Sequence, residues 1–228
     1  MKKYRIAAIP GDGIGNEVVP EGIRALETAG ARYGVEFEWR EFDWSCERYK
    51  NTGAMMPDDG IDQVRDTDGI FLGAVGFPGV PDHISLWGLL IPLRRELHQY
   101  VNLRPVRLLP GIRSPLRDRN HEDINFYVVR ENNEGEYSDR GGRLFAGTDR
   151  EMATQESIFT RHGVDRILRY AFELAQQRDA KHVTSATKSN GIIHTMPFWD
   201  ERFAAVSADY PGIRADQYHV DILAANFV

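Results

Sequence analysis

The chain has 228 residues, of which 42% are apolar and 27% charged, so it is long enough to bury a hydrophobic core without disulfide or metal staples. Its 34 acidic and 28 basic residues give a net charge of −6, which excludes a general attraction to nucleic acid or to anionic membranes. Cys46 is the only cysteine, which excludes a disulfide framework and fits the reducing cytoplasm.

No stretch approaches the roughly 20 consecutive apolar residues that a membrane helix needs. The apolar run after the N-terminal lysines is broken by Pro10 and Gly11, too soon for a secretion signal. We therefore expect a cytoplasmic protein whose partners are small molecules or protein chains, with no nucleic acid and no membrane among them.

The first hundred residues alternate between strand and helix patterns. A strand is predicted over 4–9, a second over 35–39, and between them a helix whose apolar face carries Val19, Ile23, Leu26 and Tyr33. The continuous apolar run over 69–75 predicts a central parallel strand covered on both faces. A helical pattern over 87–100 contains Pro92, which implies a start or a kink there and leaves Arg94 and Arg95 near a helix beginning.

The glycine-rich stretch GDGIG over 11–15 lies between the first strand and the first helix. Its third glycine follows two residues after the second, where the dinucleotide fingerprint GxGxxG requires three. Two interpretations stay open: a tight structural turn, or a turn before a helix whose backbone amides face an anion.

The second part of the chain continues the alternation, and we place a domain boundary near residue 99, giving domains over 1–98 and 99–228. The segment after Tyr137 is rich in Gly, Arg and Asp and predicts a hairpin arm over 137–160 that returns over 155–160. The other predicted elements are strands over 102–109, 125–129, 182–186 and 213–220, helices over 164–175 and 198–209, and a last helix that opens at Asp221 and includes Phe227 and Val228. This alternation predicts an α/β protein with a largely parallel sheet.

Charged residues follow three of the predicted strands. Arg130, Lys188 and Asp221 each lie at or just beyond a strand's carboxyl end, which is the ligand-binding edge of an open parallel sheet. For each residue taken alone, the alternative is that it is an ordinary charged residue of a solvent-exposed loop with no role in binding.

Arg130 and Tyr137 are seven residues apart in the stretch VVRENNEGEY. A guanidinium can bind a carboxylate through two parallel hydrogen bonds, and a nearby cation makes a phenol proton easier to lose. Together with Arg94 and Arg104, Arg130 could hold a di- or tricarboxylate. A solvated surface is the alternative, and it fits Arg107, Arg113, Arg117 and Arg119 well. Three histidines lack metal-ligand spacing with one another and are interpreted as surface or capping residues: His83, His98 and His121.

Six segments, taken together, resemble the metal-dependent β-decarboxylating dehydrogenases, the family of isocitrate and isopropylmalate dehydrogenases. They are GDGIG at 11–15, GAVG at 73–76, LRRELHQYVNLRP at 93–105, VVRENNEGEY at 128–137, TKSN at 187–190 and YHVDILAANFV at 218–228. Within the family, DHISLWGLLIPLRR at 82–95 is similar to the branch that acts on tartrate and D-malate, mainly because of Trp87, where relatives read the substrate's distal substituent.

The resemblance implies two α/β domains with an arm that interlocks two subunits, and a role for each matching residue. Arg94, Arg104 and Arg130 correspond to carboxylate-binding arginines, and Tyr137 and Lys188 to the acid/base pair. Asp221 corresponds to a ligand of Mn²⁺ or Mg²⁺ that reaches the neighbouring subunit's site, and Asn190 to a residue near the nicotinamide of NAD. A monovalent cation is an optional further cofactor, and the expected assembly is a homodimer with shared active sites.

The implied function is NAD- and metal-dependent oxidative decarboxylation of a small 2-hydroxy diacid: D-malate to pyruvate and CO₂, or tartrate oxidation. One alternative is a 3-isopropylmalate or isocitrate dehydrogenase. Family members continue with an aspartate-rich segment and glycine-rich cofactor loops, so we expect a truncated chain whose first domain is incomplete and exposes apolar surface. The alternative from another class is therefore a non-catalytic fragment that dimerises or binds anions.

Overall fold

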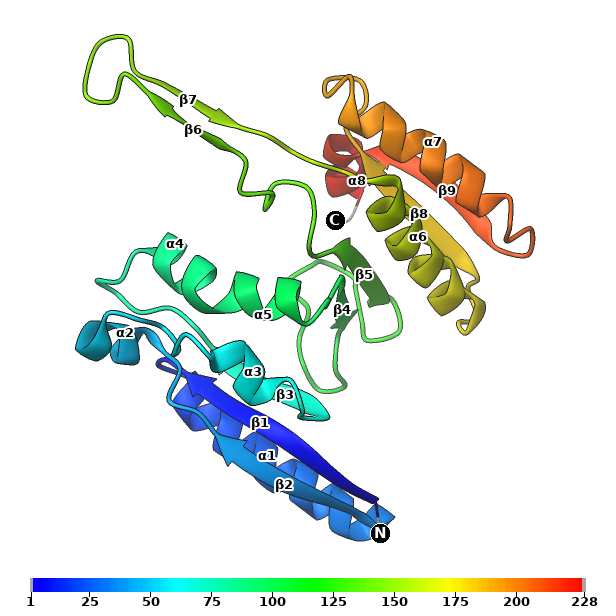
Figure 1. Ribbon diagram of the computed structural model, residues 1–228. Helices are drawn as coiled ribbons and strands as arrows, with labels where there is room; N and C mark the ends of the chain where they lie inside the picture. Colours follow the sequence, from blue (N-terminus) through cyan, green and yellow to red (C-terminus); the bar gives the residue numbers. More distant parts are fainter. Residues whose placement is uncertain (1, 227–228) are drawn as a thin grey trace. The chain divides into compact units, whose positions relative to one another are not determined.

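The computed structural model describes residues 2–226, and the chain divides into two compact units, Met1–His98 and Gln99–Val228 (Figure 1). Phe227 and Val228, which the sequence pattern assigns to the final helix, lie outside the described residues.

The first unit is built on a three-stranded parallel sheet in the order β2-β1-β3. β1 spans Lys2–Gly11, β2 spans Val35–Glu41 and β3 spans Gly69–Ala74. All three strands were predicted, but β1 holds the central position, and β3 is a half-buried edge strand within the described residues. A continuous apolar run indicates burial on both faces but does not specify how many strands flank it.

Helix α1, Gly15–Tyr33, packs on this sheet through small residues. Gly15, Val19 and Gly30 are its buried residues, and a Cβ at Gly30 would lie 2.7 Å from the carbonyl oxygen of Val35. The prediction that Tyr33 faces the core is wrong, since its side chain is 75% exposed. The helical pattern in the sequence is defined by large apolar side chains, whereas the packing of α1 on the sheet depends on glycines that let the helix and strand backbones approach closely.

The predicted helix over 87–100 begins earlier and ends earlier. It is a continuous run of α4 (Asp82–Ser85), a π-helical segment η1 (Leu86–Leu90) and α5 (Ile91–Glu96). Arg94 and Arg95 therefore lie in the last turn, which corrects the expectation that they lie near a helix beginning. The wide π-turn directly before Pro92 lets the helix continue past a residue that cannot donate a backbone hydrogen bond. Two shorter helices, α2 (Cys46–Thr52) and α3 (Gly60–Val64), complete this unit.

The GDGIG turn is held from within by Asp12, whose side chain is 4% exposed. Its carboxylate accepts hydrogen bonds from the backbone N–H groups of Cys46, at 3.0 and 3.1 Å, and Gly76, at 3.1 Å. These groups follow β2 and β3, so Asp12 ties together the loops at the carboxyl ends of all three strands. This geometry favours the interpretation of GDGIG as a structural turn.

Replacing Asp12 with asparagine should lower the free energy of unfolding at pH 7 by about 1–3 kcal/mol, because an amide NH₂ would face backbone N–H donors. Burial alone would raise the pKa of Asp12, but the hydrogen bonds from Gly76 and Cys46 hold it below the ordinary value. A lowered folded pKa contributes stability above the unfolded pKa and loses it as pH falls through the folded pKa. Urea unfolding between pH 7 and pH 2 should therefore show the difference between wild type and variant shrinking in acid; a constant difference would contradict this role.

Over residues 99–226, the second unit contains three two-stranded sheets and three helices. β4 (Val101–Arg107) and β5 (Asn125–Glu131) are antiparallel, as are β6 (Gly141–Leu144) and β7 (Met152–Gln155), whereas β8 (His182–Thr187) and β9 (Arg214–His219) are parallel. The helices are α6 (Arg161–Gln176), α7 (Thr195–Ser207) and α8 (Val220–Asn226). The α/β class is confirmed, but the expectation of a largely parallel sheet is wrong for this unit, because alternation of elements does not reveal strand direction within a hairpin.

Helix α6 is the centre of the second hydrophobic core. Its buried face was predicted and consists of Val164, Ile167, Leu168, Phe172 and Ala175, with Ala171 half-buried beside them. Phe203 and Val206 of α7 complete the core, and the Phe172 ring stacks on Tyr210 with centroids 5.0 Å apart. Among residues 2–226, no helix is both long and apolar enough to cross a membrane.

Strands β6 and β7 form a hairpin that projects from this unit (Figure 1). The predicted return over 155–160 starts too late, since β7 pairs over Met152–Gln155, and Gly135 and Ile158 then close the base through an isolated bridge. Every residue of both strands is exposed. The sequence predicted a hairpin arm but not the register of its two strands, because neither strand has a buried face that would determine the register.

Candidate active site

Lys188 and Asp221 are brought together by the parallel pair β8 and β9. Thr187 is opposite His219 in register, so the residues that follow both strands emerge at the same edge. Lys188 Nζ donates to Asp221 Oδ1 at 2.6 Å. This hydrogen bond is the main cause that lowers the pKa of Asp221. Both side chains are accessible, at 38% and 57% exposed, so a ligand could reach either one.

Arg130 lies inside β5, opposite Asn102 of the antiparallel strand β4. The expectation that Arg130 lies at a strand's carboxyl end is confirmed, since it is the penultimate residue of β5, but the expectation that this strand is parallel is wrong. Its Nη2 donates to Asn132 Oδ1 at 2.8 Å, and its Cζ is 5.9 Å from the centroid of the Tyr137 ring. Arg130 Nε is buried and has no hydrogen-bond acceptor among the described residues.

Two asparagines that the sequence reasoning missed connect Arg130 to Arg104. Asn132 is 4% exposed, and its Oδ1 accepts from Arg130 and, at 3.4 Å, from Asn102 Nδ2. Arg104 Nε donates to Asn102 Oδ1 at 3.1 Å. The amide pair therefore joins the two guanidinium groups on one face of the β4–β5 sheet. The signal that could have found them is the spacing of two residues between asparagine and arginine, which places both on one strand face, in Asn102–Arg104 and Arg130–Asn132.

The opposite face of the β4–β5 sheet explains why the side chains of Arg104 and Arg130 lie on the same face. Val101 and Val129 pack against the core of α6 and α7. Since side chains alternate along a strand, their neighbours Asn102 and Arg130 must point away from that core. Burial of the apolar face of β4 and β5 therefore determines the direction in which the polar side chains of the other face point.

Tyr137 is half-buried in the loop between β5 and the hairpin, where its ring meets the guanidinium of Arg130. Asn190 is exposed in the turn after β8, where the N–H groups of Gly191 and Ile192 donate to Lys188 O at 3.0 and 2.9 Å. Arg94 is half-buried and belongs to the other unit, as does Trp87, whose ring lies 5.0 Å from Arg95 Cζ.

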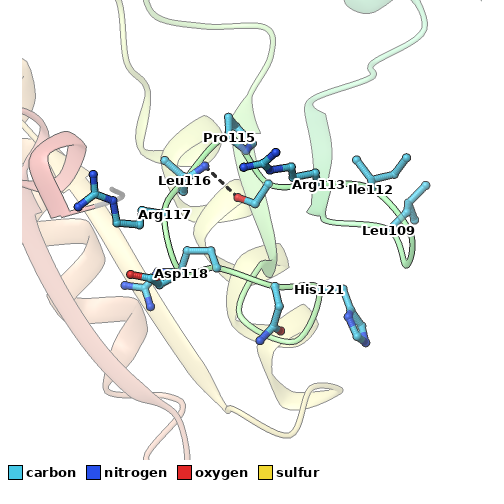
Figure 2. Close-up of a pocket in the computed structure, with 12 residues that line it drawn as sticks. Leu109, Ile112, Arg113, Pro115, Leu116, Arg117, Asp118 and His121 are labelled. Atoms are coloured by element: carbon cyan, nitrogen blue, oxygen red, sulfur yellow. Dashed lines mark hydrogen bonds between the residues drawn. The ribbon is translucent and has the colours of Figure 1, made fainter.

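Two hollows of the second unit contain none of the predicted site residues. The β4–β5 loop encloses about 750 Å³ lined by residues 109 and 111–121, Arg113 and Arg117 among them (Figure 2). A groove of about 580 Å³ between β5 and β8 is lined largely by apolar side chains, including Ile167, Leu168 and Leu174 of α6.

The fold and these side chains define an α/β protein that presents arginine, tyrosine, lysine and aspartate near its strand ends. The chain belongs to the isocitrate/isopropylmalate dehydrogenase family, whose family model matches residues 5–228. The resemblance inferred from the six segments is confirmed.

Two curated relatives carry names from the branch expected from DHISLWGLLIPLRR. The chain is 60% identical over 230 residues to "D-malate dehydrogenase [decarboxylating]" of Escherichia coli (strain K12), covering 100% of this chain and 64% of the relative. It is 58% identical over 227 residues to "Tartrate dehydrogenase/decarboxylase" of Pseudomonas putida, covering 99% and 62%. The chain thus spans less than two thirds of the length of these relatives.

Solved structures agree with the family. The isocitrate dehydrogenase of Methylococcus capsulatus matches with a TM-score of 0.85 and 28% identity, over 98% of this chain and 62% of that one. A β-decarboxylating dehydrogenase from Thermococcus kodakarensis in its apo form matches with a TM-score of 0.70 and 27% identity, over 98% and 60%.

Proposed function

We propose that the protein catalyses the NAD- and divalent-metal-dependent oxidative decarboxylation of D-malate, or the oxidation of tartrate. The observation that carries the proposal is the Lys188–Asp221 contact at the common end of β8 and β9, in a chain 60% identical to a decarboxylating D-malate dehydrogenase. The Arg130–Tyr137 pair would supply carboxylate binding and the proton that is needed after decarboxylation.

Substrate binding is assigned to the arginines. Arg104 and Arg130 lie on one face of the β4–β5 sheet, joined by the amides of Asn102 and Asn132. Guanidinium groups stay charged at any working pH and bind carboxylates through paired donors, so two of them suit a diacid. Arg94 is proposed as a third contributor from the first unit.

Proton transfer is assigned to Lys188 and Tyr137. Oxidation of a 2-hydroxy acid removes the hydroxyl proton and a hydride from carbon 2; NAD would supply the hydride acceptor, and the Lys188 amine would accept the proton as general base. Cleavage of the bond to the β-carboxylate then releases CO₂ and leaves its electron pair as an enolate. Tyr137 would donate a proton to carbon 3, which gives pyruvate when the substrate is D-malate.

Asp221 fits a metal site only as one contributor. Its exposed carboxylate is the ligand type that Mn²⁺ and Mg²⁺ prefer, but residues 2–226 contain no group of three or more His, Cys, Asp or Glu side chains that could hold a metal ion. Further ligands, substrate oxygens included, would complete it. When bound there, the cation would supply Lewis-acid stabilisation of negative charge on the substrate.

NAD and a second subunit are the other proposed partners. The exposed amide of Asn190, two residues after Lys188, is assigned to the nicotinamide end of NAD. The β6–β7 hairpin is assigned to a homodimer contact, because it exposes Leu144, Phe145 and Met152 and neither of its strands has a covered face.

The substrate is tested by measuring NADH formation with Mn²⁺ and D-malate, tartrate, 3-isopropylmalate or isocitrate. We expect the highest kcat/KM with D-malate or tartrate. A preference for 3-isopropylmalate or isocitrate would replace the substrate assignment. Absence of turnover with all four acids, together with no calorimetric NAD binding, would instead support a non-catalytic chain that dimerises or binds anions.

A further inference from the structure

The segment between Arg130 and Tyr137 contains three glutamates, and none of them is taken up by the proposed chemistry. Glu131 is the first, with a side chain only 6% exposed. Its Oε1 accepts from the N–H groups of Asn133, at 2.8 Å, and Glu134, at 3.2 Å, and from Arg166 Nη2 of α6 at 3.2 Å. Glu131 therefore holds the start of the loop and attaches it to α6.

Glu134 makes a second attachment, at the N-terminus of the same helix. Its carboxylate accepts from Thr160 N at 2.8 Å and from Thr160 Oγ1 at 2.6 Å. The Thr160 hydroxyl in turn accepts from Gly163 N at 3.0 Å and so caps α6. A Cβ at Gly163 would overlap with the Glu134 carboxylate, so the glycine makes room for this contact.

Glu136 joins the loop to the returning strand of the hairpin. Its carbonyl oxygen accepts from Gln155 Nε2 at 3.1 Å, and its carboxylate accepts from the hydroxyl of Ser157. The bridge between Gly135 and Ile158 lies next to these contacts. Tyr137 thus follows a loop that is attached at three successive points.

We propose that Glu131 and Glu134 are positioning residues that fix the segment carrying Arg130 and Tyr137 on helix α6, an inference that rests on the proposed function. Tyr137 lies outside any strand or helix, so the contacts of the preceding loop, those of the glutamates among them, contribute to its position relative to Arg130. Hydrogen bonds to a carboxylate are stronger than neutral ones, and a carboxylate at a helix N-terminus is favoured by the helix dipole. The competing interpretation is that the contacts stabilise the fold alone.

Thr160 separates these interpretations because its hydroxyl can be removed or kept. Thr160→Val loses the hydroxyl at similar volume, whereas Thr160→Ser keeps it. We expect Thr160→Val to lower kcat with D-malate on the order of 10- to 100-fold, since small misplacements of reacting groups have effects of that size. Its KM for NAD should change little, and Thr160→Ser should restore kcat to within about twofold of wild type.

Asp165→Asn is the matched control on the same helix. Asp165 accepts from Arg202 Nε and Nη2 of α7 at 2.7 and 3.0 Å, so its replacement weakens α6 packing without touching the loop. We expect it to lower the unfolding midpoint while leaving kcat within about twofold of wild type. If both variants lose stability and kcat to the same extent, or neither loses kcat, the positioning role is overturned.

Hydrogen exchange without substrate distinguishes this inference from the proposed function. Amides of residues 131–137 should exchange faster in Thr160→Val than in wild type and Asp165→Asn. A wild type without turnover refutes the proposed function, and the exchange pattern then still decides whether Thr160 and Glu134 hold the segment: unchanged exchange in Thr160→Val overturns the inference.

Discussion

Replacing Lys188 with methionine should reduce kcat for D-malate by a factor on the order of 10²–10⁴, the range expected for loss of a general base. Methionine keeps the length of the side chain but cannot accept the proton of the substrate hydroxyl. The KM for NAD should change little, because the substitution removes proton transfer and not the assigned cofactor contact. Steady-state kinetics with D-malate, NAD and Mn²⁺ measures this effect.

The structure provides controls for Lys188. Its contact with Asp221 is solvent-exposed, and exposed ion pairs contribute little to stability, so the thermal unfolding midpoint of Lys188→Met should stay close to wild type. Lys2→Met removes another exposed lysine and should retain wild-type kcat. A Lys188→Met protein that keeps wild-type kcat would remove Lys188 from the mechanism.

Replacing Tyr137 with phenylalanine should also lower kcat by roughly 10²–10⁴, through the other proton transfer. Phenylalanine preserves the ring that meets the Arg130 guanidinium, so the fold of the loop should persist while the donated proton is lost. Pyruvate formation from D-malate, measured by a coupled assay, reports the step that needs this proton.

Tyr127→Phe is the matched control for Tyr137. Tyr127 lies on β5, is 38% exposed and contacts Arg178 through its ring, so loss of its hydroxyl should leave kcat unchanged. Equal rates for Tyr137→Phe and Tyr127→Phe would show that the Tyr137 hydroxyl is not the proton donor.

Part of the site could be predicted from local sequence because parallel strands bring their ends together. Lys188 and Asp221 each lie just beyond a predicted strand, and the register of β8 and β9 brings Lys188 Nζ to 2.6 Å from Asp221 Oδ1. Helix α6 was predicted for a related reason, since the apolar residues of its buried face repeat at helical spacing. Both features depend on patterns within one segment.

The other features of the site depend on which strands and helices pair with one another, and the spacing of apolar residues within one segment does not reveal that pairing. Arg130 lies at the end of a predicted strand as Lys188 does, yet β5 pairs antiparallel with β4, and Arg130 is opposite Asn102 in that pairing. The role of Asn132 depends on the same pairing, because its amide meets Asn102 only in this register. The contacts of Glu131 with Arg166 and of Glu134 with Thr160 likewise depend on where α6 packs relative to the loop.

The residue types alone suggested that Arg94, Arg104 and Arg130 bind one ligand, and the family resemblance implies the same role. The structure joins Arg104 and Arg130 through two asparagines. Arg94 and Trp87 belong to the first unit, and the interpretation of Trp87 rests on the matching motif.

The ratio of CO₂ released to NADH formed during turnover of D-malate tests the central claim most directly. Oxidative decarboxylation through Lys188 and Tyr137 predicts one CO₂ for each NADH, with pyruvate as the organic product. NADH formed without CO₂ would indicate simple oxidation of the hydroxyl group, and CO₂ released without NADH would indicate decarboxylation without hydride transfer; either result would contradict the proposed reaction.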